Sequence, residues 1–299
     1  MAKCIFQAAF SMSKRFASKK RLRASSGRRI GKNGIDFLVS FAPIVHSTKP
    51  PHTLICGTMP SINSFRHNQY FATHNNAFWH IVGDALGHRR KAPEGGWRTK
   101  SGTLTRVPSF IEDNLLYKEG PFLTYEEQLS ALMEAGYALW DVLQSCEREG
   151  STDSKIQMKS VAGNDIRGFC EENPSIRRIC FASGASTATY FRKFNEDWLK
   201  CNQLSFAKNE ATQKVFKKFA NSRKRKRGDA PLARKSKKGG EQIELVVMQS
   251  VSPAFTRPWK NTPETPKASS MIYTDKRAFW FEHAFGIESP SGEQRHYIN

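Results

Sequence analysis

The sequence predicts an α/β protein, a three-layer α/β/α sandwich with a central, mostly parallel, four-stranded sheet. Short apolar runs alternate along the chain with longer amphipathic stretches. Strands that are separated by helices require right-handed crossovers, which place helices on both faces of a parallel sheet. The chain has 299 residues, of which 38% are hydrophobic, enough to bury a sizeable core in one or two domains.

Each element follows from a local pattern. The strands are predicted at the short apolar runs 53–56 (TLIC), 137–142 (YALWDV), 178–182 (RICFA) and 244–248 (ELVVM). The helices are predicted at the amphipathic stretches 76–86, 125–135, 165–172, 186–194 and 275–284. No apolar run approaches the roughly 18 residues that cross a bilayer, so we expect no membrane-spanning segment and no membrane partner.

The net charge of +20 is concentrated in two segments. Residues 1–35 hold ten Lys and Arg and no acid, whereas residues 214–238 hold twelve Lys and Arg and one Asp. The rest of the chain carries 25 basic and 26 acidic residues, a net charge of −1. The sequence therefore predicts a nearly neutral folded body with two basic segments.

These segments set the expected domain boundaries. Residues 1–35 are predicted to be a basic, disordered leader whose composition suits a mitochondrial presequence. Residues 36–299 are predicted to be a single domain, interrupted at about 202–242 by a disordered basic insertion. The clusters at 223–227 and 234–238 resemble a bipartite nuclear import signal, so nucleus and mitochondrion both remain open.

Six widely spaced cysteines form no Cys-x-x-Cys pair, which argues against structural zinc. Cys56 and Cys180 lie inside apolar runs and are expected to be small buried side chains in a reducing compartment.

Two strand ends carry candidate ligand-binding loops, because parallel α/β sheets bind ligands beyond the carboxyl ends of their strands. The first predicted strand is followed by 57–61 (GTMPS), and the last by 249–254 (QSVSPA). Gly and Pro shape tight turns, and small hydroxyl residues leave amides and hydroxyls free to contact phosphate. Either loop alone would suit an ordinary turn, but two matching loops favour a binding site.

Four polar or aromatic residues precede the first long helix, namely Tyr70, His74, Asn75 and Asn76. We expect Asn75 to be the N-cap of that helix, which leaves Asn76 available for chemistry.

The motifs of the chain resemble a known family. The run GTMPS…QYF…HNNAFW at 57–79 is similar to the first motif of the uracil-DNA glycosylase superfamily, in the form of its hypoxanthine-DNA (DNA-deoxyinosine) glycosylase branch. The resemblance continues through ALWDVL at 138–143, SCEREGS at 145–151, Asp153-Ser154 and Asn164-Asp-Ile166. It ends in SVSPA at 250–254, and it covers about 40–285 apart from the insertion.

The resemblance implies a monofunctional DNA repair glycosylase with a uracil-DNA glycosylase-like fold. Such an enzyme hydrolyses the N-glycosidic bond of a deaminated base, needs no metal or cofactor, and leaves an abasic site. The target nucleotide must be flipped out of the stack, because its sugar carbon cannot be reached inside the duplex. The expected partner is double-stranded or single-stranded DNA with a deaminated base, and the expected state is a monomer.

The resemblance also implies roles for single residues. Met59 stands where several sister branches have a carboxylate that handles water, and Asn76 matches the Asn on which the hypoxanthine branch relies. An amide can orient a water and support a dissociative transition state that needs little base catalysis. We therefore predict that Asn76 is the catalytic residue.

The remaining predicted site residues bind the base or the DNA. Phe71 and Phe78 are candidates for stacking on the flipped base, although Phe78 also suits a core position on its helix. Phe255 is a candidate wedge for the gap left by the flipped base, or a packed residue. The predicted DNA-binding residues come from the two loops and are Thr58, Met59, Pro60, Ser61, Ser250, Ser252, Pro253, Ala254 and Phe255.

Ser183 is the one clear departure from the branch, which has an Asn at this base-contacting position. A Ser offers one hydroxyl in place of a two-ended amide, so hypoxanthine, uracil and xanthine all remain open as targets. A catalytically weak nucleic-acid-binding module with the same fold is the alternative function. An unrelated nucleotide hydrolase is disfavoured, because the chain has no G-x-x-x-x-G-K-[ST] phosphate loop.

Overall fold

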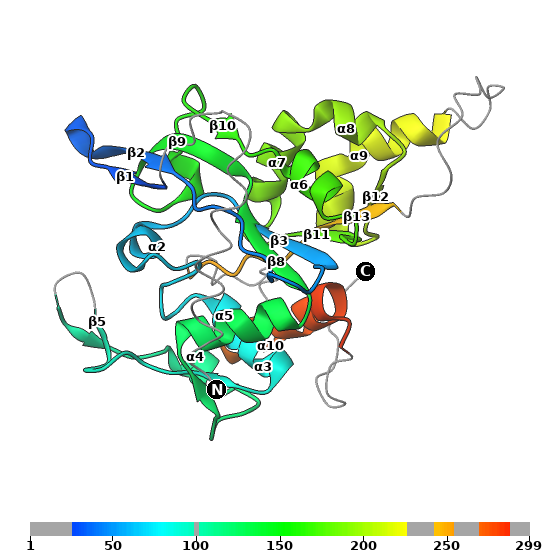
Figure 1. The fold of residues 1–299 in the computed structure, drawn as a ribbon. Helices are drawn as coiled ribbons and strands as arrows, with labels where there is room; N and C mark the ends of the chain where they lie inside the picture. Colours follow the sequence, from blue (N-terminus) through cyan, green and yellow to red (C-terminus); the bar gives the residue numbers. More distant parts are fainter. Residues whose placement is uncertain (1–25, 99–101, 226–241, 254–268, 288–299) are drawn as a thin grey trace, which may run out of the picture.

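The computed structural model describes residues 26–98, 102–225, 242–253 and 269–287 (Figure 1). Its centre is a sheet of five parallel strands in the order β12-β13-β11-β3-β8. The strands are Leu204–Phe206 (β12), Ile243–Val247 (β13), Arg178–Phe181 (β11), Thr53–Gly57 (β3) and Tyr137–Asp141 (β8). The predicted class is confirmed, and the four predicted strands correspond to β3, β8, β11 and β13. The fifth strand, β12, was not predicted.

Helices cover both faces of this sheet (Figure 1). Side chains alternate between the faces along each strand, so Ile55 packs in one core while Leu54 and Cys56 pack in the other. The first face is covered by α3 (Ala77–Leu86), α5 (Tyr125–Glu134) and α10 (Ser269–Trp280), which continues into a π-helical turn, Phe281–Phe285. The second face is covered by α6 (Ile166–Glu172), α7 (Ala185–Phe194), α8 (Glu196–Lys200) and α9 (Glu210–Arg225).

A second, antiparallel sheet lies beside the first and was not predicted. It consists of β1 (Gly27–Arg29), β2 (Ile35–Val39), β9 (Leu143–Glu149) and β10 (Ala162–Gly163). Arg28 Nε donates to Asp36 Oδ2 at 2.6 Å between β1 and β2. Residues 27–35 are therefore part of the folded body, which corrects the predicted boundary of the leader at residue 35. Residues 1–25 lie outside the described residues.

The predicted disordered insertion is partly folded. Strand β12 pairs with β13, and α9 buries Phe216 and Phe219 against the second face of the central sheet. These aromatic residues lie three positions apart on one side of a helix that also carries six Lys and Arg residues. The basic composition therefore led to a prediction of disorder for a segment that forms an amphipathic helix. Residues 226–241, with most of the two basic clusters, lie outside the described residues.

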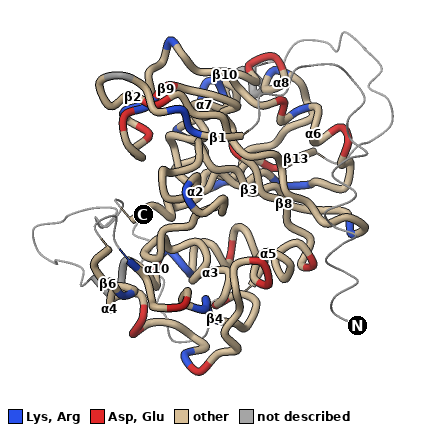
Figure 2. Tube along the Cα trace, turned by 60° about the vertical axis from the view of Figure 1, so that its left-hand side comes forward, with Lys and Arg blue, Asp and Glu red and all other residues tan. Residues whose placement is uncertain are grey.

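Small elements complete the described fold. They are α2 (Ile62–His67), α4 (Ser109–Glu112), the 3₁₀ turns Lys32–Gly34 and Asp153–Lys155, the pair β4 (Arg89–Arg90) and β7 (Phe122–Leu123), and the hairpin β5 (Trp97–Arg98) and β6 (Leu104–Thr105). Figure 2 shows basic and acidic positions interspersed over the described chain. Among the described helices, none has the length and apolar character to span a membrane.

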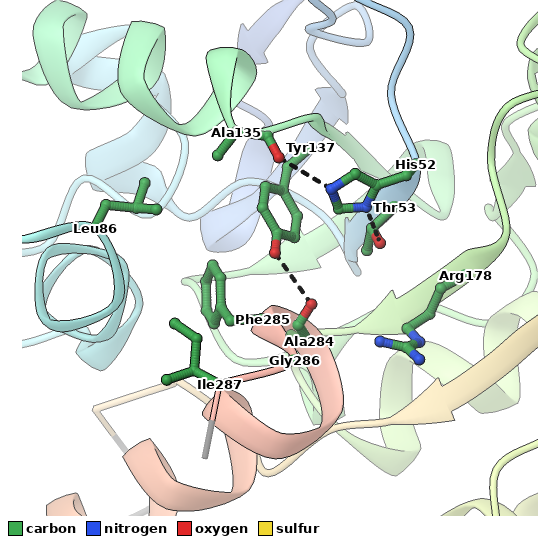
Figure 3. A pocket seen from close by; sticks show the side chains of 10 residues that line it. All are labelled: His52, Thr53, Leu86, Ala135, Tyr137, Arg178, Ala284, Phe285, Gly286 and Ile287. Atoms are coloured by element: carbon green, nitrogen blue, oxygen red, sulfur yellow. Dashed lines mark hydrogen bonds between the residues drawn. The ribbon is translucent and has the colours of Figure 1, made fainter. Parts of the chain in front are cut away.

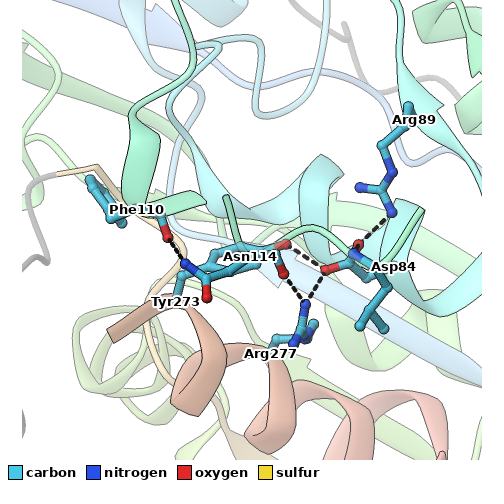
Figure 4. Close-up of polar contacts among 7 residues, drawn as sticks. Asp84, Arg89, Phe110, Asn114, Tyr273 and Arg277 are labelled. Atoms are coloured by element: carbon cyan, nitrogen blue, oxygen red, sulfur yellow. Dashed lines mark hydrogen bonds and ion pairs between the residues drawn. The ribbon is translucent and has the colours of Figure 1, made fainter. Parts of the chain in front are cut away.

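Asp84 joins α3 to three other elements on the first face of the sheet (Figure 4). Its Oδ1 accepts hydrogen bonds from Arg89 and from Leu116 N, the latter at 3.0 Å. Its Oδ2 accepts from the Tyr273 hydroxyl and from Arg277 Nη1, both at 2.9 Å. One buried carboxylate thus compensates two buried guanidinium groups, and it fixes α3 against α10.

This network predicts a large loss of stability for Asp84→Asn. The variant leaves two guanidinium groups buried without their carboxylate, so we expect the free energy of unfolding in urea to fall by about 3–5 kcal/mol. Glu171→Gln is the control, because it removes an exposed ion pair to Arg167 within α6 and should leave the unfolding midpoint unchanged. A loss below about 1 kcal/mol in Asp84→Asn would contradict the role given to this carboxylate.

Candidate active site

The carboxyl ends of four parallel strands meet at one edge of the central sheet. Cys56 pairs with Phe181, and Phe181 pairs with Val247, so β3, β11 and β13 end at the same level. Beyond the strands, Ala182 N donates to Cys56 O at 2.9 Å and Val251 N donates to Ala182 O at 3.1 Å. The loops at 57–61, 182–184 and 249–253 therefore lie side by side, as the fold class predicts.

The side chains of the first loop face mostly inward. The Thr58 hydroxyl donates to Asp153 Oδ2 at 2.6 Å and lies 2.7 Å from Thr187 Oγ1. The sequence predicts a hydroxyl that is free to contact phosphate, and the structure instead shows this hydroxyl engaged inside the protein. The Met59 side chain is 6% exposed within the core, and Pro60 is buried. Ser61 caps α2, its Oγ accepting from Ser64 N at 3.1 Å. Any contact from Thr58, Met59 or Pro60 to DNA must therefore come from the main chain.

The two aromatic candidates for base stacking have different surroundings. Phe78 is fully buried, and its ring packs edge-on against Trp79 and Trp280 at centroid distances of 5.0 and 5.8 Å. Phe78 is therefore a core residue, and its predicted contact with the base is wrong. The Phe71 ring lies 4.3 Å from that of Phe78, is only half-buried, and stands on backbone with φ 53°. Such strain in a bulky residue clusters at functional sites.

Asn76, and not Asn75, is the N-cap of α3. Asn76 Oδ1 accepts from Phe78 N at 2.9 Å, and the residue is 9% exposed. This corrects the prediction that Asn75 caps the helix and Asn76 is left free. Instead, Asn75 Oδ1 is buried without a hydrogen-bond partner in the described part of the chain. The cap bond uses one lone pair of Asn76 Oδ1, which fixes the plane of the amide and leaves its Nδ2 hydrogens and a second lone pair for other groups.

The second loop contacts the residues around Asn76. Ala77 N donates to Val251 O at 3.1 Å, which joins the start of α3 to the loop after β13. Gly184, with φ 77°, lies against this loop, where an added Cβ would be 3.3 Å from Met248 O and 3.7 Å from Ser250 Cβ. Ser183 is therefore next to the same loop. Ser250, Ser252 and Pro253 are partly exposed, whereas Ala254 and Phe255 lie outside the described residues.

Asp141 is a buried acid that the sequence analysis missed. It ends β8 opposite Gly57, where an added Cβ would lie 2.4 Å from Asp141 Oδ1 and 3.8 Å from Phe71 Cζ. Its Oδ2 has no hydrogen-bond partner among the described residues. Burial raises the pKa of Asp141 to about 8, against a lowering by Arg148. Burial thus favours the protonated form of this acid, and an Asp at the end of an apolar strand is the signal that could have identified it.

Three residues to which the sequence analysis gave no role, Arg148, Ser151 and Asp153, contact the first loop and the start of α2 from β9 and the turn after it. They belong to the SCEREGS motif and to the Asp that follows it. Buried and exposed side chains alternate along the second half of β9, and Arg148 falls on a buried position of this alternation. That alternation is the sequence signal that could have placed Arg148 inside the protein.

The segment before Asn76 is held by a hairpin and by α3. Arg90 Nη2 donates to Ala72 O at 2.9 Å, and its guanidinium lies 4.6 Å from the Trp97 ring centre. The His74 ring also stacks with the Trp97 ring, at a centroid distance of 5.9 Å. His80 Nε2 lies 2.8 Å from His74 O, and burial lowers the pKa of His80 to about 4, so it is neutral at pH 7.

A cavity of about 340 Å³ lies at the opposite end of the sheet (Figure 3). Its lining includes Thr53, Tyr137 and Arg178, which are the first residues of β3, β8 and β11. The Tyr137 hydroxyl donates to Ala284 O at 3.2 Å, and Arg178 pairs with Glu244. This cavity is therefore separate from the candidate site. Over the described ranges, no three His, Cys, Asp or Glu side chains gather as a metal site.

The raised pKa of Asp141 predicts a pH-dependent stability. Between the ordinary pKa near 4 and about 8, the folded protein keeps a proton that the unfolded chain releases, so the stabilisation present at low pH is lost as the pH rises. Asp141→Asn should remove this dependence. We expect the unfolding free energy of the variant relative to wild type to rise by more than about 1 kcal/mol from pH 5 to pH 8. Parallel curves for the two proteins in urea titrations would contradict the assignment.

Comparisons with known proteins give the following matches. No protein-family model matches the chain. A hypoxanthine DNA glycosylase of Methanosarcina acetivorans is 33% identical over 128 residues, which is 43% of this chain and 61% of the relative. A hypoxanthine DNA glycosylase of Methanosarcina barkeri is 23% identical over 150 residues, which is 50% of this chain and 73% of the relative.

A solved structure is also similar. It is the solution NMR structure of a candidate uracil DNA glycosylase from Methanosarcina acetivorans, with 21% identity and a TM-score of 0.41 over 82% of this chain and 98% of that one. The chain matches about three fifths of the length of the first curated relative. By these sequence matches the chain is homologous to hypoxanthine DNA glycosylases, in agreement with the resemblance of its motifs.

Proposed function

We propose that the protein is a monofunctional DNA glycosylase that hydrolyses the N-glycosidic bond of a flipped, deaminated base. Homology to hypoxanthine DNA glycosylases supports the reaction class. The proposed target is hypoxanthine in DNA, with uracil and xanthine as the other bases to be tested. The product would be DNA with an abasic site, and no group other than water would be consumed.

The placement of Asn76 is the observation that carries this proposal. Asn76 lies where the start of α3 meets the loop after β13, through the bond from Ala77 N to Val251 O. Its amide cannot rotate freely, because Oδ1 accepts from Phe78 N. The half-buried Phe71 ring packs against Phe78, whose main-chain N–H forms this bond to Asn76. A fixed amide and a partly exposed aromatic ring are thus brought together at the ligand-binding edge of the sheet.

The chemistry that this arrangement supports is dissociative hydrolysis. As the glycosidic bond lengthens, the sugar becomes cationic and the base leaves as an anion, so the site needs fixed dipoles rather than a strong base. Asn76 can accept from a water through the second lone pair of Oδ1 while Nδ2 donates. Met59 is buried and carries no acid, so the first loop supplies no carboxylate in its place.

Base preference would be set by the groups around Phe71. A flipped base stacked on this ring would lie near Gly57, which has no side chain of its own and lies beside the Asp141 carboxyl group, and near the turn that carries Ser183. Ser183 donates or accepts one hydrogen bond, so it discriminates less strongly than the amide that the branch has there. Hypoxanthine, uracil and xanthine should therefore be assayed together.

The test of the proposal is excision of a single damaged base. Purified protein would be incubated with duplexes that contain one inosine, uracil or xanthine, and abasic sites would be cleaved with alkali. We expect scission with at least one base, and a loss of at least about 100-fold in the single-turnover rate for Asn76→Ala. Asn76→Asp keeps an N-cap oxygen but loses the Nδ2 donors and adds a charge beside the departing anion, so it should be equally impaired.

The matched control for this loss is Thr124→Ala. Thr124 caps α5 through its Oγ1, which accepts from Glu127 N at 3.3 Å, so this variant also loses a helix cap but lies outside the site. Both Ala variants should lose about 1 kcal/mol of stability, and only the Asn76 variant should lose activity. No scission by wild type, with DNA binding intact, would favour the nucleic-acid-binding module instead. Full activity of Asn76→Ala would refute the role of Asn76.

The basic residues at 226–238 predict a second property, the salt dependence of DNA binding. Six Lys and Arg residues in this stretch can neutralise phosphates, and each neutralised phosphate adds roughly 0.9 to the slope of log K against log salt. Replacing all six with Gln should flatten the slope and weaken binding without a change in base preference. A changed preference among inosine, uracil and xanthine would mean that this segment contacts the base.

A further inference from the structure

The main-chain carbonyls of residues 57–60 in the first loop accept hydrogen bonds from one direction in the described part of the chain. Four successive carbonyls accept hydrogen bonds from the end of β8 and from β9. Val142 N donates to Gly57 O at 2.8 Å, and Leu143 N donates to Thr58 O at 3.1 Å. Arg148 supplies the other two, with Nη1 at 3.4 Å from Met59 O and Nη2 at 2.6 Å from Pro60 O.

Arg148 is unusual because it is fully buried and bonded to main-chain oxygens. Its Nε donates to Gly150 O at 2.9 Å, so its three hydrogen bonds among the described residues all go to main-chain carbonyls. Within the described ranges it forms no ion pair within 4.0 Å, although Asp141 and Asp153 act on it at longer range. Burial lowers the pKa of Arg148, yet a guanidinium stays charged at neutral pH. A cation is therefore held directly behind the loop.

Two neighbours of Arg148 anchor the same loop at its ends. Asp153 Oδ2 accepts from the Thr58 hydroxyl at 2.6 Å, and Ser151 Oγ accepts from Ile62 N at 3.0 Å. The stretch from Arg148 to Asp153 thus contacts the loop at its start, middle and end. This accounts for the SCEREGS motif and the following Asp, to which the proposed reaction gives no role.

The direction of the carbonyls fixes the direction of the amides. In a planar trans peptide the C=O of one residue and the N–H of the next point in opposite directions. Since the carbonyls of Thr58 and Pro60 point toward β9, the N–H groups of Met59 and Ser61 point away from it. Main-chain N–H groups are common ligands of DNA phosphates.

We propose that Arg148 is a positioning residue, which holds the carbonyls of Met59 and Pro60 so that the loop presents its amides to a DNA phosphate beside the flipped nucleotide. The inference rests on the proposed glycosylase function. Arg148 itself touches neither base nor sugar. A guanidinium suits the task because its planar fork donates to two carbonyls at once, which the single ammonium of Lys cannot match.

The test compares Arg148→Lys and Arg148→Met with a matched control, Arg192→Met. Arg192 Nη1 also donates to a main-chain carbonyl, Val215 O at 2.8 Å, but it joins α7 to α9 away from the loop. The melting temperature of each variant is measured first. Two further quantities are then measured well below it, namely the single-turnover rate on an inosine duplex and the Kd for a duplex with a tetrahydrofuran abasic analogue.

We expect Arg148→Met to lower the single-turnover rate at least about 50-fold and to weaken the Kd for the abasic analogue about 10-fold. Arg148→Lys should lie between this variant and wild type, because it keeps the charge and loses the fork. Arg192→Met should change neither quantity more than about twofold. If Arg148→Met does not fold, the same rate and Kd are measured on Arg148→Lys and on Thr58→Val, which removes the bond to Asp153.

Wild-type rate and Kd in folded Arg148 variants, with only the melting temperature lowered, would overturn the inference and leave Arg148 a structural residue. Failure of the proposed function looks different. Wild type would then release no base from any duplex, and the inference would be decided by the Kd for the abasic analogue alone. Equal Kd values for wild type and Arg148→Met would overturn it in that case as well.

Discussion

The parallel register of β8, β3, β11 and β13 is the constraint on which the candidate site depends. Because these strands end at one level, the loops that follow them lie beside one another although they are far apart in the sequence. Backbone hydrogen bonds then extend this order beyond the sheet, through Ala182 and Val251 to the start of α3. A shift of one residue in a strand would turn its core side chains to the wrong face, and in β13 it would also move Val251 away from the start of α3.

Main chain and side chains have separate tasks at this edge. In the first loop Thr58 and Met59 direct their side chains into the protein, so what the loop can offer to DNA is mainly backbone. The side chains available for the base are few, and they come from other segments, chiefly Phe71, Asn76 and Ser183. Such a division suits an enzyme that holds the DNA backbone without regard to sequence and reads one flipped base.

The sequence predicted the parts of the fold in which local pattern and burial agree. The four buried strands and four of the five amphipathic helices were found with nearly correct ends, because their apolar periodicity is strong, whereas α10 begins at Ser269, six residues before its predicted start. Strand β12 was missed because it has only three residues, and helix α9 because its six Lys and Arg make the segment polar, although Thr212, Phe216 and Phe219 are buried on one side of it. The antiparallel sheet was missed because β9 carries polar residues on its exposed face, and such alternation is weak over so few residues.

The candidate site was predicted in outline but not in its contacts. The family motifs identified the two loops and Asn76, whereas the N-cap was placed one residue too early, since Asn75 and Asn76 are equally good caps by residue type. Phe78 could be assigned to the core only once Trp280 was known to pack on it from a distant helix. Asp141 and Arg148 depend on contacts between strands, which no local pattern contains.

The most direct measurement is a crystal structure of Asn76→Ala bound to a duplex with one deoxyinosine. The account predicts that the inosine is flipped, with its base on the Phe71 ring and its C1′ facing residue 76. It further predicts that phosphates on either side contact the main chain at 57–61 and 250–253. An inosine that stays stacked in the duplex, or a base bound at the opposite end of the sheet near Tyr137, would contradict it.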